Sequence, residues 1–301
     1  MATVLDYLRF VREYAAMSVR RLLGTLTDGR FACSLDSGET IRVAIRVDRE
    51  RARATVDFAG TSGQSQSNFN APEAVTRAAV LYVFRSLVGE DIPLNEGCLE
   101  PLDIRIPKPS LLSPAPPAAV VAGNVETSQC VTDALLGALN ALAASQGTMN
   151  NLSFGNASLQ YYETIAGGAG AGPGWPGADA VQTHMTNSRM TDPEVLEQKF
   201  PVLVESCSIR RGSGGGGRFR GGDGTVRRLR FRAPMQASIL SGHRIVAPFG
   251  LAGGEPGATG TNRLERSDGS IETLGGTATV ELGAGDCLVV ETPGGGGFGS
   301  R

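Results

Sequence analysis

The sequence predicts an α+β protein with a helix-containing N-terminal half, which includes a hairpin, and a β-rich C-terminal half with glycine-rich turns. Before residue 145 apolar residues recur at helical spacing in several segments, and after it they fall in short runs separated by glycine. The 301 residues include 41 glycines and 16 prolines, and 41% of the residues are hydrophobic. Glycine and proline together stay below the ~25–30% that is typical of disordered chains, so we expect a folded core.

Helical and strand patterns alternate in the first half. The expected elements are a helix over residues 4–23, a hairpin of strands over 41–47 and 54–58, a helix from Pro72 up to Gly89, and a strand over 102–106. The two helices carry apolar side chains every three or four residues and end at a glycine. The three strands alternate apolar and polar side chains, which indicates one buried face.

A polar cluster marks the start of a third helix. The run GNVETSQ, residues 123–129, precedes a segment with valine and leucine at helical spacing. The backbone N–H groups and the dipole at a helix start favour anions, which makes this a candidate substrate site. Capping by Asn124, Thr127 or Ser128 explains the same residues equally well. Glu126 is the one acid near this helix start.

From residue 145 onward the pattern favours a β-sandwich or a barrel-like layer. Strands are expected over residues 160–165, 202–209, 225–231, 238–240, 277–282 and 288–291, with one short helix over 193–199. Three glycine clusters, residues 167–174, 212–217 and 294–297, flank these strands. Either they form tight loops, or their backbone N–H groups make an anion nest.

Composition excludes several kinds of site. Lysine occurs only at Lys108 and Lys199, and neither fits the P-loop pattern G-x-x-x-x-G-K-[ST]. Five widely spaced cysteines without a C-x-x-C pair, with two histidines, argue against zinc and suit reduced thiols. The net charge of −2 does not favour nucleic acid, and the arginine run over residues 227–232 is expected to form a solvated strand face or a phosphate or partner contact. We find no signal sequence and no apolar stretch of membrane-spanning length, so we expect a cytoplasmic protein without membrane contact.

Other polar side chains could also take part in chemistry. His184 lies with Asn187 in the run THMTNSR, residues 183–189, where it could act as a general acid or base or serve as a structural side chain. Asn150 and Asn151 are amides suited to hold a polar substrate or an oxyanion. We find neither a G-x-S-x-G nucleophile elbow nor a catalytic cysteine motif.

Ten segments, taken together, resemble the hydantoinase B/oxoprolinase family and occur in the family's order. They are VDFAGTS (56–62), NFNAP (68–72), IPLNEGC (92–98), PAAVVAGNVETSQ (117–129), ASQGTMNN (144–151), YETIAGGAGAGPG (162–174), THMTNSR (183–189), residues 211–224, residues 249–256 and ETPGGGGFG (291–299). These segments extend over nearly the whole chain.

The resemblance implies part of a cytosolic, ATP-dependent cyclic-amide hydrolase similar to 5-oxoprolinase or N-methylhydantoinase. It also implies that a separate A-type subunit or half handles ATP and Mg, and that the chain works within an oligomeric complex. Full-length members carry a further N-terminal region with a metal-binding stretch rich in aspartate and histidine. No segment here matches that stretch, so we assign no metal ligand and no bound cofactor to this chain. We expect residues 1–301 to form one domain of the family type that is inactive alone, with a change of pattern near residue 145. Either the chain is a fragment, or the missing half is a separate chain.

The resemblance and the residues together suggest roles. Glu126 or His184 is the candidate general base. The candidate substrate-binding residues are Asn124, Thr127, Ser128, Gln129, Asn150, Asn151 and Asn187. Two alternatives stay open: a scaffold half without chemistry of its own, and a subunit of an acetone-carboxylase-like complex that acts on a ketone with bicarbonate.

Overall fold

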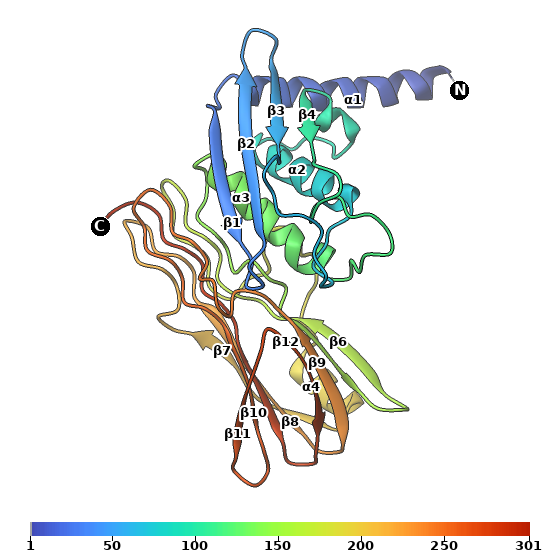
Figure 1. Cartoon of the computed structure of the whole chain (residues 1–301), viewed down its shortest axis with the longest axis vertical. Coiled ribbons are helices and arrows are strands. Elements are labelled where there is room, and N and C mark those ends of the chain that lie inside the picture. Colours follow the sequence, from blue (N-terminus) through green and yellow to red (C-terminus); the bar gives the residue numbers. More distant parts are fainter. Residues whose placement is uncertain (1) are drawn as a thin grey trace. The chain divides into compact units, whose positions relative to one another are not determined.

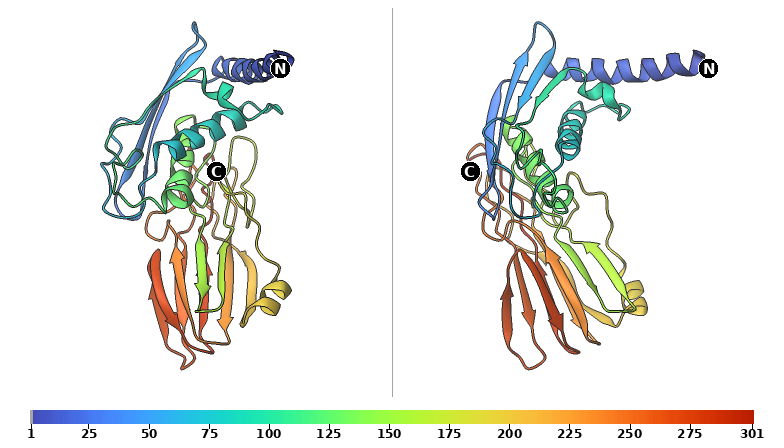
Figure 2. Two further views of the ribbon diagram at one scale, coloured as in Figure 1. Left: turned by 90° about the vertical axis from the view of Figure 1, so that its right-hand side faces the viewer. Right: turned by 45° about the vertical axis from the view of Figure 1, so that its right-hand side comes forward.

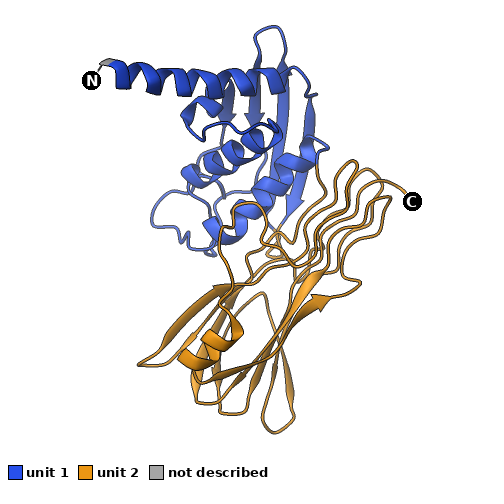
Figure 3. Cartoon of the chain, turned by 180° about the vertical axis from the view of Figure 1, so that it is seen from behind, with its two compact units in different colours: residues 1–34, 39–141 blue, residues 35–38, 142–301 orange. Residues whose placement is uncertain are grey.

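The computed structural model describes residues 2–301, which divide into two compact units (Figure 3). Unit 1 comprises residues 1–34 and 39–141, and unit 2 comprises residues 35–38 and 142–301. The main division therefore falls close to the change of sequence pattern near residue 145. Three of the α-helices lie in unit 1, whereas unit 2 consists mainly of strands, so the predicted α+β class is confirmed.

Unit 1 contains one four-stranded sheet in the order β1-β2-β3-β4 (Figure 1). The strands are β1 (Gly29–Ser34), β2 (Thr40–Asp48), β3 (Arg53–Asp57) and β4 (Leu102–Arg105). β2 and β3 form the predicted antiparallel hairpin, and β4 lies parallel to β3. β1 was not predicted; it pairs with β2 and places Cys33 in the interior.

Helices pack beside this sheet. They are α1 (Ala2–Leu23), α2 (Glu73–Leu87), the short 3₁₀ helix η1 (Glu96–Leu99), the π-helical turn η2 (Gly123–Thr127) and α3 (Ser128–Ala138). α3 contacts β1, β2 and α2, and all of its residues are buried. The helix predicted over residues 4–23 is confirmed as α1, but its predicted apolar face is only partly buried. Val19 is buried, whereas Val4, Leu8 and Val11 are exposed.

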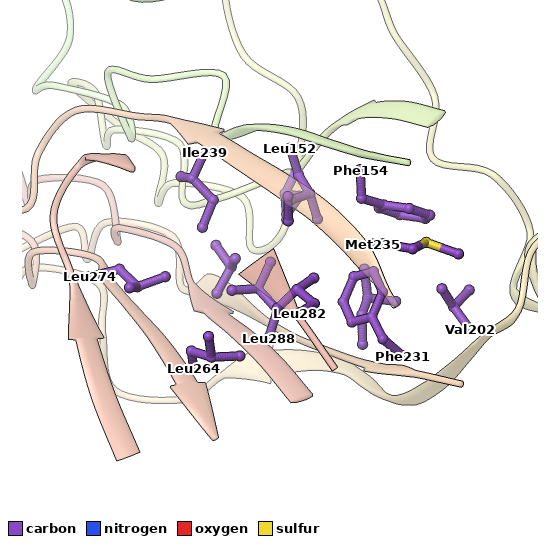
Figure 4. Packing of buried hydrophobic residues seen from close by; sticks show 14 of the residues in the cluster. Leu152, Phe154, Val202, Phe231, Met235, Ile239, Leu264, Leu274, Leu282 and Leu288 are labelled. Atoms are coloured by element: carbon purple, nitrogen blue, oxygen red, sulfur yellow. The ribbon is translucent and has the colours of Figure 1, made fainter. Parts of the chain in front are cut away.

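Unit 2 is a sandwich of two antiparallel sheets, in the orders β11-β10-β13-β8-β7 and β12-β9-β5-β6. Its elements are β5 (Asn151–Gly155), β6 (Gln160–Thr164), α4 (Pro193–Lys199), β7 (Val202–Arg210), β8 (Gly224–Phe231), β9 (Met235–Leu240), β10 (Thr261–Glu265), β11 (Ile271–Leu274), β12 (Thr277–Leu282) and β13 (Cys287–Glu291). The core lies between the sheets, where Leu152 and Phe154 of one meet Phe231 and Leu288 of the other (Figure 4). The sandwich, the six predicted strands and α4 are confirmed, and β5, β10 and β11 are additional.

The glycine clusters pack against one another. We call residues 167–177, 212–222, 250–257 and 294–297 the glycine layer; they lie side by side in unit 2 and exchange backbone hydrogen bonds. The N–H of Gly222 donates to Ala169 O at 2.8 Å, and the N–H of Gly295 donates to Gly222 O at 2.9 Å. A Cβ on Gly168 would lie 2.0 Å from Gly222 O, so a side chain there would collide with the neighbouring segment of the layer.

The glycine layer includes tight turns at residues 172–175 and 251–254, as one of the two expectations has it, and its segments also pack closely against one another. Several of its N–H groups donate to neighbouring carbonyls, so they are not presented together as an anion nest. Only three of its glycines, Gly174, Gly212 and Gly253, have a positive φ. Close backbone approach, more than turn formation, is what requires glycine in this layer.

The arginine run on β8 does not form a single solvated face. Successive side chains of a strand point to opposite faces, so Arg227 and Arg228 diverge. Arg228 lies half-buried and pairs with Glu265 at 2.7 Å. Arg227 is fully buried, and its Nε and Nη2 donate to the two carboxylate oxygens of Glu163 at 3.2 and 3.1 Å. The expectation of a solvated face is thus wrong for Arg227, because the alternation places it inside.

Candidate functional site

The predicted helix start is a π-helical turn that continues into α3 without a break. The N–H groups of Glu126 and Thr127 both donate to Ala122 O, at 2.8 and 3.3 Å. Neither Thr127 nor Ser128 caps the helix: Thr127 Oγ1 donates to Phe69 O, and Ser128 Oγ donates to Asn124 O at 2.5 Å. Single π turns in α-helices occur frequently at functional sites, so this geometry marks residues 123–127 for attention.

A second segment of unit 1 fixes the position of this turn. The Asn70 side chain accepts from Ser65 N and donates to the carbonyls of Ser65, Ser67 and Ala119 at 3.0 Å. It thereby ties the loop before α2 to the chain that leads into η2. A Cβ on Gly123 would lie 2.4 Å from Asn70 O, so the close contact between the two segments requires glycine.

Buried polar side chains follow one side of the helix from this turn onward. Glu126 and Asp133 are each 1% exposed, and Gln129 is fully buried between them in the sequence. Spacings of three and four residues bring such side chains to one helix side. Asn124, in contrast, is exposed at the first turn. Two buried carboxyl groups on one helix are the strongest acid–base candidates in unit 1.

The neighbouring groups show the electrostatic effect of these carboxylates. The pKa of the Cys130 thiol is raised well above its usual value by a hydrogen bond with Cys33, by burial, and by the negative charges of Asp133 and Glu126. The pKa of Tyr82 on α2 is raised, chiefly by burial and also by Asp133. Both the Cys130 thiol and the Tyr82 hydroxyl therefore stay protonated at neutral pH.

In unit 2, Asn150 is held inside a polar network. Its Nδ2 donates to Gln146 Oε1 at 2.7 Å and to Ile165 O at 3.1 Å, and its Oδ1 accepts from Arg244 Nη2 at 2.9 Å. Arg244 also donates to Asn262 Oδ1 at 2.9 Å. Both amide hydrogens of Asn150 are thus engaged within the chain, so its Nδ2 could donate to a substrate only by giving up one of these bonds.

The other predicted residues of unit 2 have different surroundings. Asn151 is 5% exposed, and its side chain donates to Leu240 O at 2.9 Å and accepts from Tyr162 Oη at 2.6 Å. His184 is half-buried with a φ of +51°, and Asn187 is exposed, both in the loop that precedes α4. The structure therefore brings together Asn124 to Gln129 in unit 1, and it places the remaining candidates in unit 2.

Sequence reasoning missed two residues that define the unit 1 site, Asp133 and Asn70. Asp133 lies seven residues after Glu126, a spacing of two helical turns that would have identified it. Asn70 gave no comparable signal, because its role depends on a contact with residue 119. Over residues 2–301, no three histidine, cysteine or acidic side chains are arranged to hold a metal, and no helix has the length and apolarity needed to cross a bilayer.

Comparisons with known proteins agree on a family. The model of the family "Hydantoinase B/oxoprolinase" matches residues 1–301. The chain is 49% identical to 5-oxoprolinase 1 of Arabidopsis thaliana over 317 aligned residues, which cover 100% of this chain and 25% of the plant protein. The chain thus spans about a quarter of the length of this relative.

Two solved structures share the fold. An ATP-dependent caprolactamase from Pseudomonas jessenii matches with a TM-score of 0.82 and 23% identity. The match covers 100% of this chain and 56% of the caprolactamase chain. A nucleotide-free acetone carboxylase matches with a TM-score of 0.82 and 17% identity. The match covers 95% of this chain and 47% of the carboxylase chain. At these identities the likeness establishes the fold.

Proposed function

The chain belongs to the hydantoinase B/oxoprolinase family, and we propose that it forms part of an ATP-dependent cyclic-amide hydrolase that opens 5-oxoproline or a hydantoin. The observation that carries this proposal is the 49% identity to a 5-oxoprolinase along the whole chain. In the proposed complex, an A-type subunit or half binds ATP and phosphorylates the amide oxygen. The present chain then acts on the activated ring.

The proposed chemistry requires a base, a positioned water and donors for the developing negative charge. Phosphorylation of the amide oxygen makes the carbonyl carbon electrophilic, so water can attack it once a base removes a proton. Glu126 is the candidate that the geometry supports best, because it is 1% exposed in the π turn and shares a helix side with Asp133. His184, half-buried in unit 2, is the other candidate.

We propose different roles for the predicted residues of this turn, binding for some and positioning for others. Asn124 is exposed at the first turn and is available to a ligand. Thr127 and Ser128 donate to backbone carbonyls, so we assign them to holding the turn. Gln129 is buried three residues after Glu126, and we retain it as a candidate for orienting the substrate or the base.

The test is a reconstituted complex of this chain with an A-type subunit, assayed with 5-oxoproline and with hydantoin in the presence of ATP. A general base contributes about 10²–10⁴-fold, so Glu126→Gln is expected to lower kcat by that factor. Glu96→Gln, which changes a glutamate that is exposed on η1, serves as the matched control and should leave kcat unchanged. His184→Ala tests the second candidate. If both Glu126→Gln and His184→Ala keep kcat within about threefold while the complex stays intact, the assignment of the base is wrong.

A simpler measurement tests whether ATP hydrolysis belongs to the partner and not to this chain. The isolated chain is expected to hydrolyse no ATP, since the sequence contains no P-loop pattern. ATP hydrolysis by the purified chain, lost in a variant of one of its own residues, would contradict the assignment of ATP chemistry to a partner.

A second candidate function is a subunit of an acetone-carboxylase-like complex. The fold match to acetone carboxylase supports it as an alternative. Consumption of acetone and bicarbonate with ATP, without ring opening of 5-oxoproline or hydantoins, would favour this branch. A scaffold role without chemistry predicts that neither Glu126→Gln nor His184→Ala changes the rate of an active complex.

A further inference from the structure

The π turn η2 is held from outside by the loop that precedes α2. We call residues 68–70 the clamp loop. Three hydrogen bonds join this loop to the chain at and before η2: Ala122 N donates to Asn68 O at 3.0 Å, Thr127 Oγ1 donates to Phe69 O, and Asn70 Nδ2 donates to Ala119 O at 3.0 Å. The side chains of Asn70 and Thr127 are fully buried, so water does not compete for their bonds.

The hydroxyl group of Thr127 is used differently from that of another buried threonine on the same helix. Thr132 Oγ1 donates to Ser128 O, four residues earlier, at 3.0 Å. This is the usual bond of a threonine within a helix. Thr127 Oγ1 instead donates out of its helix to Phe69 O. The position of Thr127 is therefore coupled to the clamp loop, whereas that of Thr132 is set within the helix.

The local sequence permits a regular α-helix where the structure has a π turn. Residues 123–138 contain no proline, and in an α-helix the N–H of Ser128 would donate to Asn124 O. In the structure this N–H donates to Gly123 O, while Ser128 Oγ donates to Asn124 O at 2.5 Å. Because π turns are rare and the α pattern is the regular one, contacts from outside the helix must stabilise this turn.

We propose that the clamp loop holds residues 123–127 in the π pattern, and that Thr127 and Asn70 thereby act as positioning residues for Glu126. The inference rests on the proposed role of Glu126 as the base. Without the clamp bonds the turn is expected to relax to the α pattern, in which each N–H donates to the carbonyl one residue further along. One residue corresponds to a rotation of roughly 100° about the helix axis.

The relaxation is expected to move Glu126 and to leave α3 in place. α3, green in Figure 2, contacts β1, β2 and α2, and all of its residues are buried. The residues before Thr127 would therefore turn relative to α3. Glu126, which is 1% exposed in the π turn, would leave its buried position. A displacement of a reacting group by about 1 Å can already lower a rate about 10²-fold.

Crystal structures of variants of the full chain test the clamp without any assay of activity. Thr127→Val keeps the shape of the side chain and removes the hydroxyl group. In this variant Ser128 N is expected to donate to Asn124 O, and Glu126 is expected to become exposed. Thr127→Ser keeps the hydroxyl group and should keep the π turn.

Two further variants complete the structural test. Thr132→Val is the matched control, because it makes the same change at a buried threonine whose bond lies within the helix, and it should keep the π turn. Asn70→Asp replaces the donating amide by an acceptor of the same shape and should release the turn as Thr127→Val does. A change to the α pattern in either Thr127→Val or Asn70→Asp supports the proposal, and a π turn that persists in both overturns it.

Kinetics of the reconstituted complex separate this inference from the proposed function. Thr127→Val is expected to lower kcat about 10²-fold, whereas Thr127→Ser should keep it within about threefold and Thr132→Val should leave it unchanged. Recovery by serine distinguishes the hydroxyl group from packing, because serine loses a methyl group that valine retains. If Thr127→Val adopts the α pattern and keeps kcat within about threefold, the clamp is supported and the assignment of Glu126 as the base is wrong.

Discussion

Substitution of Gly168 by alanine tests whether close packing explains the glycine layer. The added Cβ would lie 2.0 Å from Gly222 O and 2.3 Å from Gly295 N, and these two atoms form a hydrogen bond of 2.9 Å. The methyl group would therefore overlap both the donor and the acceptor of this hydrogen bond. Ordinary contact distances begin near 3.4 Å, so the backbone must move by more than 1 Å and this hydrogen bond must break.

The expected loss of stability follows from two contributions. Overpacking a close-packed interior typically costs about 1–3 kcal/mol. A buried hydrogen bond whose groups lose their partners costs about 1–3 kcal/mol more. We therefore expect Gly168→Ala to lower the free energy of unfolding of unit 2 by about 2–6 kcal/mol, a large share of the ~5–15 kcal/mol that a typical domain possesses.

Equilibrium unfolding in urea measures this change. Trp175 is the one tryptophan of the chain and lies within the glycine layer, so its fluorescence reports on the unfolding of unit 2. The matched control is Gly275→Ala in the same unit, where a Cβ would lie at an ordinary contact distance of 3.6 Å from Thr277 O. We expect the control to change stability by less than about 1 kcal/mol. If Gly168→Ala costs no more than Gly275→Ala, close packing is not the reason for glycine in this layer.

Three further predictions concern buried and charged groups. Arg227→Met leaves the carboxylate of Glu163 buried and unpaired, so it should cost about 3–5 kcal/mol in urea unfolding, and adding Glu163→Leu should recover most of the loss. A single variant as stable as the wild type would contradict a structural ion pair. Hydrogen bonds from Arg228 lower the pKa of Glu265 to about 2; the stability that it contributes is therefore present above its ordinary pKa near 4.5 and is lost as the pH falls towards 2. Urea unfolding at stepped pH should show a weaker acid dependence for Glu265→Gln, and an unchanged dependence would refute this. Cys207 is exposed whereas the other four cysteines are buried, so a thiol reagent should modify one thiol quickly, and Cys207→Ser should abolish that phase.

Much of the fold follows from local patterns. The α2 helix and the β2–β3 hairpin were predictable because a single buried side gives a clear period in the sequence. β10 was missed because its five residues, TNRLE, contain one large apolar side chain, Leu264, although that side chain is buried in the sandwich core. A short strand in the interior of a sheet gains its stability from neighbours that are distant in the sequence, which a local pattern does not reveal.

The helix start at residues 123–129 was predictable in position, but its hydrogen bonds were not. The polar run of residues 123–129 does begin a helix, as its composition indicates. The sequence could not show that Thr127 and Ser128 bond to carbonyls instead of capping, since this depends on the approach of Phe69 and Asn70 from the preceding loop. A tertiary contact thus decides which of the local hydrogen bonds forms.

The glycine layer and the helix start were both candidates for binding an anion, and the structure distinguishes them. Both offered backbone N–H groups that could have bound an anion. In the layer, N–H groups such as those of Gly222 and Gly295 donate to neighbouring backbone carbonyls, which leaves them unavailable to a ligand. At the helix start, by contrast, Asn124 is exposed while Glu126, in the same turn, is buried. Because a reacting site needs both access for the substrate and a shielded acid or base, the first turns of η2 and α3 satisfy the chemistry better than any part of the glycine layer.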